Sequence, residues 1–411
     1  MINDFEAKLE RYAALAVEVG VNVRPGQTLV VTAGITSAPF VRKVVKKAYE
    51  AGAKNVHVEW SDDVVTRTKY ELAPDEAFQE YPQWRAKGWE DMAEDNAAFL
   101  SIVAANPDLL KGIPAERIAN ANKAAGIALK TWRTYTMSDK VSWSIVAVPS
   151  ADWAAKVFPD VAPEARQDAL WDAIFAATRI NEPDPVAAWK THIDVLDRKA
   201  SILNEKKYFA LRYTGPGTDL TLELPQGHIW ISAGSENAKG DIFVANMPTE
   251  EVFTAPLRGG ANGTVTSTKP LSYGGNLIKD FVLTFKDGKV VDIQAEEGLE
   301  VLQNLIGTDD GAAFLGEVAL VPHRSPISDT NLIFYNTLFD ENASCHLAIG
   351  KAYAFCVEGG KAMNEEQQIA AGLNSSLVHV DFMIGSAELD IDGIRADGTA
   401  EPLFRGGNWA I

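Results

Sequence analysis

In the first half of the chain, hydrophobic and polar positions alternate between helical and extended patterns. Apolar residues that recur every three or four positions predict two amphipathic helices, over residues 5–19 and 40–48. Short apolar or alternating runs predict strands in between. These strands span residues 28–32, 56–60, 99–104 and 142–148. This order of elements is typical of an open, largely parallel sheet covered by helices.

The pattern of predicted helices and strands changes after a proline-bearing segment at residues 181–185. A long polar helix over about 186–206 is the expected connector. Beyond it, short strands are expected at residues 208–213, 220–224 and 228–232, separated by glycine- and proline-bearing turns. The clearest local signal is a β-hairpin over 281–293, because its Asp287-Gly288 pair suits the positive φ angles of a tight turn.

We therefore expect an N-terminal α/β domain over residues 1–205 and a strand-rich α+β domain over residues 206–411. The loops that bind phosphates in many α/β domains are missing, since neither GxGxxG nor GxxxxGK[ST] occurs. The sequence gives no support for a nucleotide-binding role.

The net charge limits the classes of binding partner, and the cysteine content indicates the cellular compartment. With 38 Lys and Arg against 56 Asp and Glu, the net charge is −18, and the acidic residues are spread along the chain. Such a surface repels nucleic acid and anionic lipid, and it favours cations or ligands with a positive end. The two cysteines, the absence of a long apolar span and the lack of a signal-peptide pattern predict a protein of the cytoplasm.

His379 and Asp381 stand two positions apart in an apolar run. In a strand they would project from the same face, about 7 Å apart along the chain, so both could reach one metal cluster. A buried His-Asp hydrogen-bonded pair is the structural alternative. Glu317 also interrupts an apolar run, where a lone carboxylate costs several kcal/mol unless a cation or a proton compensates it. An edge strand that exposes Glu317 is the alternative.

Two further segments contain candidate metal ligands. His346 precedes a segment that we expect to be helical, and two turns of helix would bring Tyr353 to the same face. Taken alone, Tyr353 is better explained as a tyrosine at the edge of the core. Glu250 and Glu251 follow Pro248, and this pair of carboxylates is either a helix start or a metal-binding arm.

Carboxylates and imidazoles together form the oxygen and nitrogen donor set that suits zinc, cobalt or manganese, and they are numerous enough for two ions. Two such ions can lower the pKa of a shared water and polarise a carbonyl, which permits peptide hydrolysis without a protein nucleophile. HExxH and GxSxG are both absent, which excludes a zincin and argues against a serine hydrolase.

At these residues the sequence resembles the M29 family of aminopeptidases, whose fold is the thermophilic metalloprotease fold. The resemblance covers essentially the whole chain, and the occurrence of its motifs in order is highly specific. The matching stretches are residues 213–219, 246–256, 316–322, 334–346 and 379–381.

The resemblance implies an enzyme that removes the N-terminal residue of short peptides through two divalent ions: zinc, cobalt, manganese or magnesium. It implies metal ligands at Glu251, Glu317, His346, His379 and Asp381. Glu251 is chosen over Glu250 because its spacing from Glu317 agrees with the family. Glu317 and Tyr353 are the expected catalytic residues, with Tyr353 beside the metals as a weak ligand or a donor to the oxyanion. His323 and Cys345 have no ligand role in that pattern.

The family also implies a homodimer, in which the N-terminal domain helps to enclose the active site. Two other functions remain open on the residues alone. One is a different metal-dependent amidohydrolase that uses the same cluster, and the other is a binding protein that captures a small cationic ligand without turnover.

Overall fold

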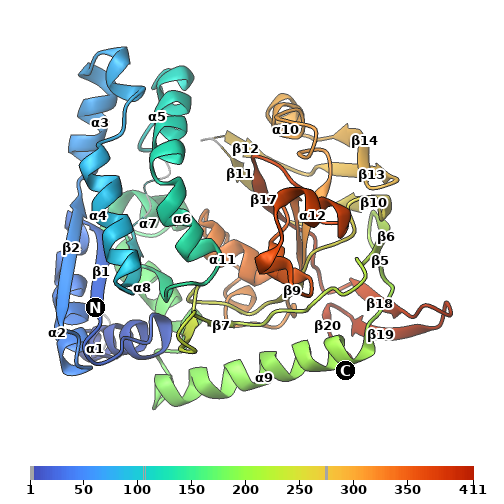
Figure 1. Cartoon of the computed structure of the whole chain (residues 1–411), viewed down its shortest axis with the longest axis horizontal. Coiled ribbons are helices and arrows are strands. Elements are labelled where there is room, and N and C mark those ends of the chain that lie inside the picture. Colours follow the sequence, from blue (N-terminus) through green and yellow to red (C-terminus); the bar gives the residue numbers. More distant parts are fainter. Residues whose placement is uncertain (1–3, 105, 107, 274–275) are drawn as a thin grey trace. The chain divides into compact units, whose positions relative to one another are not determined.

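The protein is described here by a computed structural model covering residues 4–104, 106, 108–273 and 276–411. Its residues group into two compact units. Unit 1 consists of Met1–Thr191 and Gly234–Pro248, and unit 2 consists of His192–Ala233 and Thr249–Ile411. The long helix predicted over about 186–206 is confirmed as α9, Pro185–Lys206, drawn in green in Figure 1. A domain boundary between residues 205 and 206 stays a prediction.

Unit 1 is built on a parallel sheet with the strand order β2-β1-β3-β4, as the sequence predicts. Because crossovers between parallel strands are right-handed, stepping from β1 to β2 and then back across to β3 sends the connecting helices to opposite faces. We call this four-stranded sheet the parallel sheet. Its strands are β1 (Thr28–Gly34), β2 (Asn55–Ser61), β3 (Ala98–Val103) and β4 (Trp143–Ala147).

The helices of unit 1 cover this sheet with apolar side chains. Val30 and Phe99 on neighbouring strands pack with Ala93 of α4 and with Trp132 of α6, while α2 packs against β1. The predicted opening helix is confirmed, although its last turn is a π-helix over Ala16–Gly20. The helices are α1 (Phe5–Leu15), α2 (Ala38–Glu50), α3 (Asp63–Leu72), α4 (Gln83–Glu94), α5 (Ala115–Ala128), α6 (Lys130–Met137), α7 (Ala151–Val157) and α8 (Arg166–Ala177). A small pair of strands, β7 (Gly234–Glu236) and β8 (Ile242–Val244), completes this unit.

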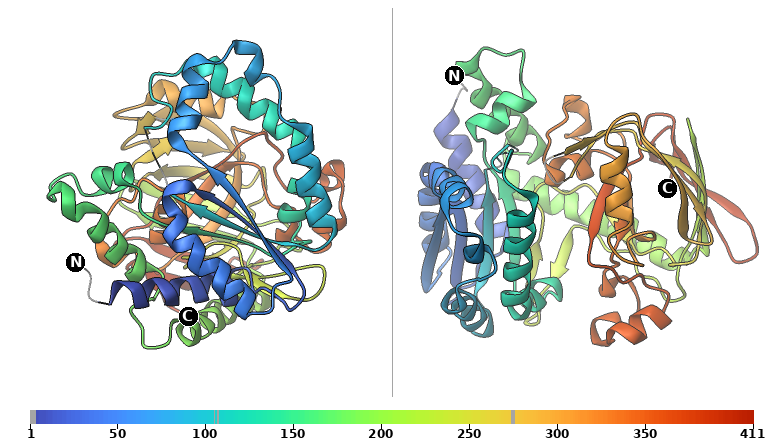
Figure 2. Two further views of the ribbon diagram at one scale, coloured as in Figure 1. Left: turned by 90° about the vertical axis from the view of Figure 1, so that its left-hand side faces the viewer. Right: turned by 90° about the horizontal axis from the view of Figure 1, so that it is seen from above.

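Unit 2 contains an eight-stranded antiparallel sheet, whose strands are seen side by side in yellow-green, gold and dark red in the right-hand view of Figure 2. The predicted hairpin is confirmed, since Asp287 and Gly288 have φ angles of 50° and 82°. The predicted strand at 228–232 is wrong, because this segment forms only isolated bridges at His228 and Ile231. In spatial order the strands are β14 (Lys289–Gln294), β13 (Val282–Lys286), β10 (Ala261–Thr266), β6 (Thr218–Glu223), β5 (Ala210–Gly215), β18 (Asp390–Ile394), β19 (Ala400–Arg405) and β20 (Asn408–Trp409).

A second, four-stranded antiparallel sheet in unit 2 carries the candidate chemistry. We call it the β15 sheet. One of its faces packs into the main core of the unit through Val252, Val318, Leu347, Ile349 and Phe382. Its strands, in order, are β17 (His379–Met383), β16 (His346–Gly350), β15 (Leu315–Leu320) and β9 (Val252–Thr254). Smaller elements of unit 2 are β11 (Leu271–Tyr273), β12 (Asn276–Ile278), α10 (Leu299–Ile306), α11 (Thr337–Asp340) and α12 (Glu365–Ala370).

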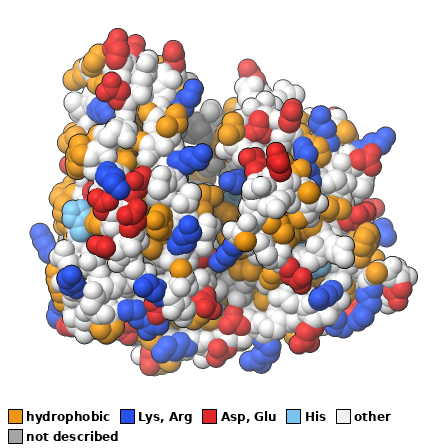
Figure 3. All heavy atoms as spheres, in the orientation of Figure 1, with side chains coloured by type: hydrophobic (Ala, Val, Ile, Leu, Met, Phe, Trp, Pro, Cys, Tyr) orange, Lys and Arg blue, Asp and Glu red, His pale blue; other side chains and the backbone are white. Residues whose placement is uncertain are grey.

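Acidic and basic side chains are interspersed over the face of the molecule seen in Figure 3. The excess of carboxylates is therefore not gathered into a single patch on that face. Within the ranges that the structure describes, no helix combines the length and the apolar character needed to cross a bilayer.

Candidate metal centre

The second face of the β15 sheet brings the predicted residues together. In an antiparallel pair, residues opposite each other project from the same face. Glu317 lies opposite Ala348, which in turn lies opposite Asp381, and His379 lies opposite Gly350. His346, two and four positions before Ala348 and Gly350 on the same strand, projects from this face as well. One face of the sheet thus holds four of the five predicted ligands.

A β-bulge determines the direction of Glu317. Leu315 pairs with Ile349 and packs into the core, and simple alternation would turn Glu317 to that same apolar side. The register shifts between these two residues, so that Glu317 instead faces the histidines. The extra residue is Gly316, where an added Cβ would lie 2.4 Å from the carbonyl oxygens of Gly350 and Lys351. Glycine is thus required where the carboxylate is redirected.

Glu317 lies in the interior of the sheet, between β16 and β9, so the alternative of an exposed edge strand is wrong. Its side chain is buried. The cost of burying this carboxylate must therefore be compensated locally.

The segment before β9 supplies the fifth predicted ligand. Glu251 Oε2 lies 3.3 Å from His346 Nε2. Its neighbour Glu250 points elsewhere, with Oε2 3.4 Å from His192 Nε2. His192 Nε2 also lies 2.8 Å from the carbonyl oxygen of Thr249. Thr249–Glu251 lies in no helix, so the alternative of a helix start is wrong, and Glu251 reaches the sheet face.

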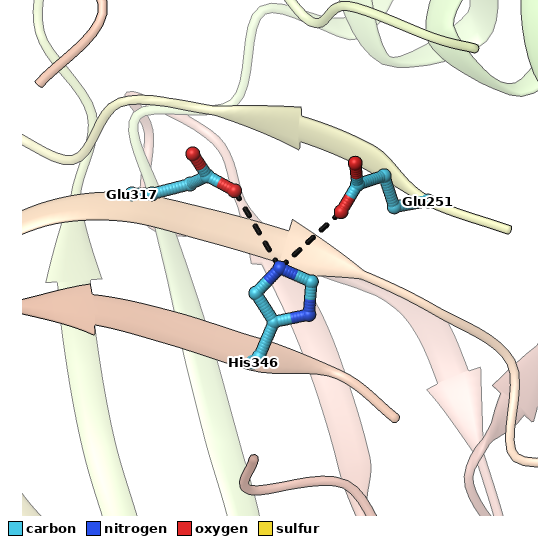
Figure 4. Close-up of side chains that lie close together, drawn as sticks. All are labelled: Glu251, Glu317 and His346. Atoms are coloured by element: carbon cyan, nitrogen blue, oxygen red, sulfur yellow. Dashed lines mark ion pairs between the residues drawn. The ribbon is translucent and has the colours of Figure 1, made fainter. Parts of the chain in front are cut away.

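Two groups of donor atoms share Glu317. The first consists of Glu251, Glu317 and His346, with Glu317 Oε1 3.5 Å from His346 Nε2; both carboxylates point to this nitrogen in Figure 4. In the second group, His379 Nε2 lies 3.6 Å from Glu317 Oε2 and 3.4 Å from Asp381 Oδ1. The two oxygens of one carboxylate thus face two different imidazoles.

Backbone carbonyls orient both imidazole rings. His346 Nδ1 lies 3.1 Å from the carbonyl oxygen of Ser344, and His379 Nδ1 lies 2.7 Å from that of Lys351. A carbonyl oxygen only accepts hydrogen bonds, so each Nδ1 carries a proton. Once Nε2 loses its proton, each ring presents a lone pair to a cation held by the carboxylates, as metal-binding histidines do when a partner holds the other nitrogen.

The ionisation of these side chains reflects the crowding of charge. Burial raises the pKa of Glu317, although the contact with His346 opposes this effect. Burial alone would lower the pKa of His379, but contacts with Asp381 and Glu317 raise it to about 9. The pKa of His346 is likewise raised well above its usual value, because Glu251 and Glu317 outweigh the effect of burial.

Without a cation, protons on the histidines compensate the carboxylates. A divalent ion is the natural replacement for these protons, since it binds neutral imidazole and ionised carboxylate together. The donor types, their burial and the tautomers of both rings all fit a metal.

Tyr353 lies beside the cluster, but not on a helix. The expected helix after His346 is wrong: His346 begins strand β16, and Tyr353 stands in extended backbone before a short 3-10 helix, Ala354–Cys356. Its ring centroid is 4.8 Å from that of His379. Burial and the negative charges of Glu317 and Asp381 raise the pKa of Tyr353 well above its usual value. The phenol therefore stays protonated and can act as a hydrogen-bond donor.

The sequence reasoning did not identify Glu341. Burial raises the pKa of this carboxyl group well above its usual value, and the nearby charges of Asp381 and Glu251 raise it further. It therefore belongs to the same electrostatic cluster. The only available signal was its position in the motif that ends at His346, since a carboxylate between Asp340 and Asn342 stands out by neither periodicity nor composition.

Asn342 joins two parts of this site. Its buried side chain accepts a hydrogen bond from the backbone N–H of Glu250 at 2.8 Å, and it donates one to Glu341 Oε1 at 3.4 Å. The arm that carries Glu251 and the carboxylate of Glu341 are thus tied to one side chain, which the sequence reasoning also missed.

Comparison with known proteins agrees with this geometry. Residues 5–409 match the model of the thermophilic metalloprotease family, M29. The chain therefore belongs to the M29 family of metalloproteases. The expected class, a metalloaminopeptidase and hence a hydrolase, is confirmed at this level by the family and by the names of its relatives.

Those relatives match the chain from end to end. It is 59% identical to aminopeptidase AmpS of Bacillus subtilis over 410 residues, covering 100% of both chains. It is 42% identical to aminopeptidase T of Thermus aquaticus, covering 99% of both. The solved structure of wild-type AmpT from Thermus thermophilus superposes with a TM-score of 0.94 at 41% identity, covering 99% of this chain and 100% of that one.

Proposed function

We propose that this protein removes the N-terminal residue from short peptides at a centre where Glu317 and the side chains around it would hold two divalent cations. The observation that carries the proposal is the division of the Glu317 carboxylate, with Oε1 beside His346 and Oε2 beside His379. A carboxylate shared in this way is suited to two neighbouring ions and has no evident use around one.

Glu251 and His346 would hold one ion, and His379 and Asp381 would hold the other, with Glu317 common to both. Glu341 is available as an additional metal ligand or as a proton acceptor. Bound divalent ions supply Lewis acidity, which lowers the pKa of water and polarises a carbonyl group. Zinc, cobalt and manganese suit this donor set, and magnesium suits its carboxylates.

The protein's own residues account for orientation and charge. Tyr353 keeps its proton and donates a hydrogen bond to the oxygen that becomes negative as the peptide bond is attacked. The carboxylates attract the α-ammonium group of the peptide, which a blocked N-terminus lacks. This charge requirement distinguishes an aminopeptidase from a general amidohydrolase.

The same proposal includes a homodimer that works in the cytoplasm, with a catalytic domain over residues 206–411. Both cysteines, Cys345 and Cys356, are buried free thiols, which is compatible with a reducing compartment. Light scattering at micromolar concentration tests the dimer, and a monomer would contradict it.

Metal titration and substrate choice test the function. Protein stripped with a chelator is reloaded with zinc, cobalt or manganese, bound metal is measured by elemental analysis, and leucine p-nitroanilide is compared with its N-acetylated form. We expect two ions per chain and release from the free amine alone. Release from the acetylated compound would favour the amidohydrolase, and binding without release would favour the ligand-binding protein. One ion at saturation would contradict a two-ion centre.

A further inference from the structure

A short stretch of chain, Gly350–Ala352, leads out of the end of β16 beside the candidate metal centre. We call it the 350 segment. The carbonyl oxygen of Lys351 in this segment lies 2.7 Å from His379 Nδ1. Two carbonyl oxygens of the segment come so close to Gly316 that an added Cβ would lie 2.4 Å from each. Because Gly316 is the bulge residue that directs Glu317, the segment contacts the supports of two predicted ligands.

The side chain of Asn374 holds the 350 segment in place. This residue is only 3% exposed. Its Nδ2 donates to the carbonyl oxygen of Gly350 at 2.6 Å and to that of Gly311 at 2.8 Å. The backbone carbonyl oxygen of Asn374 accepts a hydrogen bond from the N–H of Ala352 at 2.9 Å. Two of these three hydrogen bonds therefore end on the 350 segment.

The Gly311 end of this link is itself anchored. Asp309 Oδ1 accepts the N–H of Gly311 at 2.9 Å, and Asp309 Oδ2 accepts that of Leu377 at 2.6 Å. The Ser376 hydroxyl also donates to Asp309 Oδ1, at 2.9 Å. The loop at Gly311 and the chain that follows Asn374 are thus tied together, so the amide joins the 350 segment to a fixed point.

Only a donor group suits the position of Asn374 Nδ2. Carbonyl oxygens accept hydrogen bonds and never donate them, so an oxygen in the place of this nitrogen would face two acceptors. Asn374 Oδ1 is buried and has no hydrogen-bond partner among the residues that the structure describes. An unpaired buried oxygen costs free energy. The side chain therefore contributes through the two N–H bonds of its amide.

We propose that Asn374 is a positioning residue for the second donor group, which consists of Glu317, His379 and Asp381. Its amide fixes the 350 segment, and the segment in turn sets the direction of Glu317 and His379. The inference rests on the proposed metal-dependent function. Asn374 itself bonds to no predicted ligand, so it acts through the carbonyl oxygen of Lys351 and through the bulge.

The first donor group depends on Asn374 to a smaller extent. The carbonyl oxygen of Ser344 orients the ring of His346, and Glu251 belongs to the segment before β9. Only Glu317, which both groups share, depends on the bulge. Loss of the Asn374 amide should therefore weaken the binding of one ion more than that of the other.

Two single-ligand variants separate the two ions. Glu251→Ala disables the first donor group, His379→Ala disables the second, and Asn374→Ala is added to each. Calorimetric titration with zinc measures the ion that each protein still binds. In the Glu251→Ala background we expect Asn374→Ala to weaken binding about 10- to 100-fold, as is typical when a group that orients metal ligands is lost. In the His379→Ala background we expect about threefold or less, because only Glu317 is affected.

Equal losses in both backgrounds would overturn the proposal and indicate a general structural role for Asn374. Unchanged zinc binding in both would overturn it as well. If a single-ligand variant binds no zinc, hydrogen exchange decides.

Hydrogen exchange of the metal-free protein tests the same role without an ion. Asn374→Asp keeps the shape of the side chain and removes both N–H donors. We expect the backbone amides of the 350 segment to exchange about tenfold faster than in the parent, since local opening becomes easier. The amides of β9 should keep their parental rates. Unchanged exchange in the 350 segment, or equal acceleration throughout unit 2, would contradict the proposal.

Asn237→Asp is the matched control, since Asn237 is a buried amide of unit 1, 4% exposed, whose Nδ2 donates to Ser142 Oγ at 2.9 Å. It should alter neither zinc binding nor exchange in the 350 segment. The number of ions that the parent binds at saturation is a separate result. One ion would contradict the two-ion centre, whereas the exchange rates would still decide the role of Asn374.

Discussion

The parallel sheet of unit 1 and the β15 sheet of unit 2 each have four strands. The two sheets differ in the side chains that their faces carry. In the parallel sheet, α4 and α6 cover the face that bears Val30 and Phe99. In the β15 sheet, one face packs in the core and the other carries Glu317 with the two histidines. Every residue of β15 is buried, Glu317 included.

This difference shows which kind of buried residue identifies a site. The parallel sheet includes the half-buried hydroxyls of Thr32 and Ser101, which satisfy each other with a 3.1 Å hydrogen bond. The carboxylates of the β15 sheet satisfy one another only through shared protons or a cation, because like charges crowd them. Hydroxyl pairs satisfy each other within a sheet, whereas a crowded set of carboxylates and imidazoles needs added protons or a cation.

The largest effect is expected from Glu317→Gln, which keeps the shape of the side chain and removes the charge shared by both donor groups. We expect kcat/KM to fall about a thousandfold or more, with less bound metal, since an interaction made by both ions is lost. Activity assays with elemental analysis measure both quantities. Thr32→Val in the parallel sheet is the control: it costs about 1 kcal/mol of stability and leaves activity within about twofold. Near-parental turnover of Glu317→Gln at parental metal content would refute the ligand assignment.

The next largest effect is expected from Gly316→Ala. The added Cβ meets backbone oxygens at 2.4 Å, so the bulge must shift and Glu317 loses its direction. We expect about a hundredfold weaker metal binding together with a loss of stability of about 2 kcal/mol. Calorimetry of metal binding and urea unfolding separate the two effects.

Gly34→Ala at the end of β1 is the matched change in the parallel sheet, where an added Cβ meets only Thr36 Oγ1 at 3.7 Å. It should alter neither metal binding nor stability appreciably. If Gly316→Ala lost stability but bound metal like the parent, the bulge would be a structural feature without influence on the site.

A smaller effect, about tenfold per pH unit for each proton released, is expected for metal affinity. His379 has a pKa of about 9 in the metal-free protein, so an ion must displace its proton at neutral pH. Affinity should therefore rise with pH up to about 9. Stability of the metal-free protein should change in the opposite direction: the raised pKa stabilises the fold below the ordinary histidine value of about 6.5, and this contribution is lost as pH rises through 9.

Melting temperatures of metal-free and metal-loaded protein between pH 6 and pH 9, together with dissociation constants, check both signs. A metal affinity independent of pH in this range would show that His379 is not a ligand.

The smallest effect is expected from Asn342→Ala. It removes the acceptor for the Glu250 N–H and the donor to Glu341, and with them the link between two parts of the site. Loss of a group that orients ligands typically weakens metal binding about tenfold. Asn342→Asp keeps the acceptor and should restore part of the affinity, whereas a purely structural role predicts similar binding in both variants.

Part of the fold could be predicted because it depends on local periodicity. The four parallel strands, the long helix α9 and the hairpin at Asp287-Gly288 are confirmed. Two predictions are wrong: the helix after His346 and the strand at 228–232. A short apolar run is compatible with both helix and strand, and strands that are distant in the chain decide whether it pairs.

For the site, the sequence by itself determined the donor set: His379 and Asp381 on one strand face, a carboxylate inside an apolar run, and the motifs of the family. Only the tertiary structure decided that Glu251 and not Glu250 reaches His346, that Gly316 redirects Glu317, and that Glu341 joins the cluster. The physical reason is that these facts depend on strand register and on pairing between segments more than 60 positions apart, as between Glu251 and Glu317, and no local pattern of polar and apolar residues records that pairing.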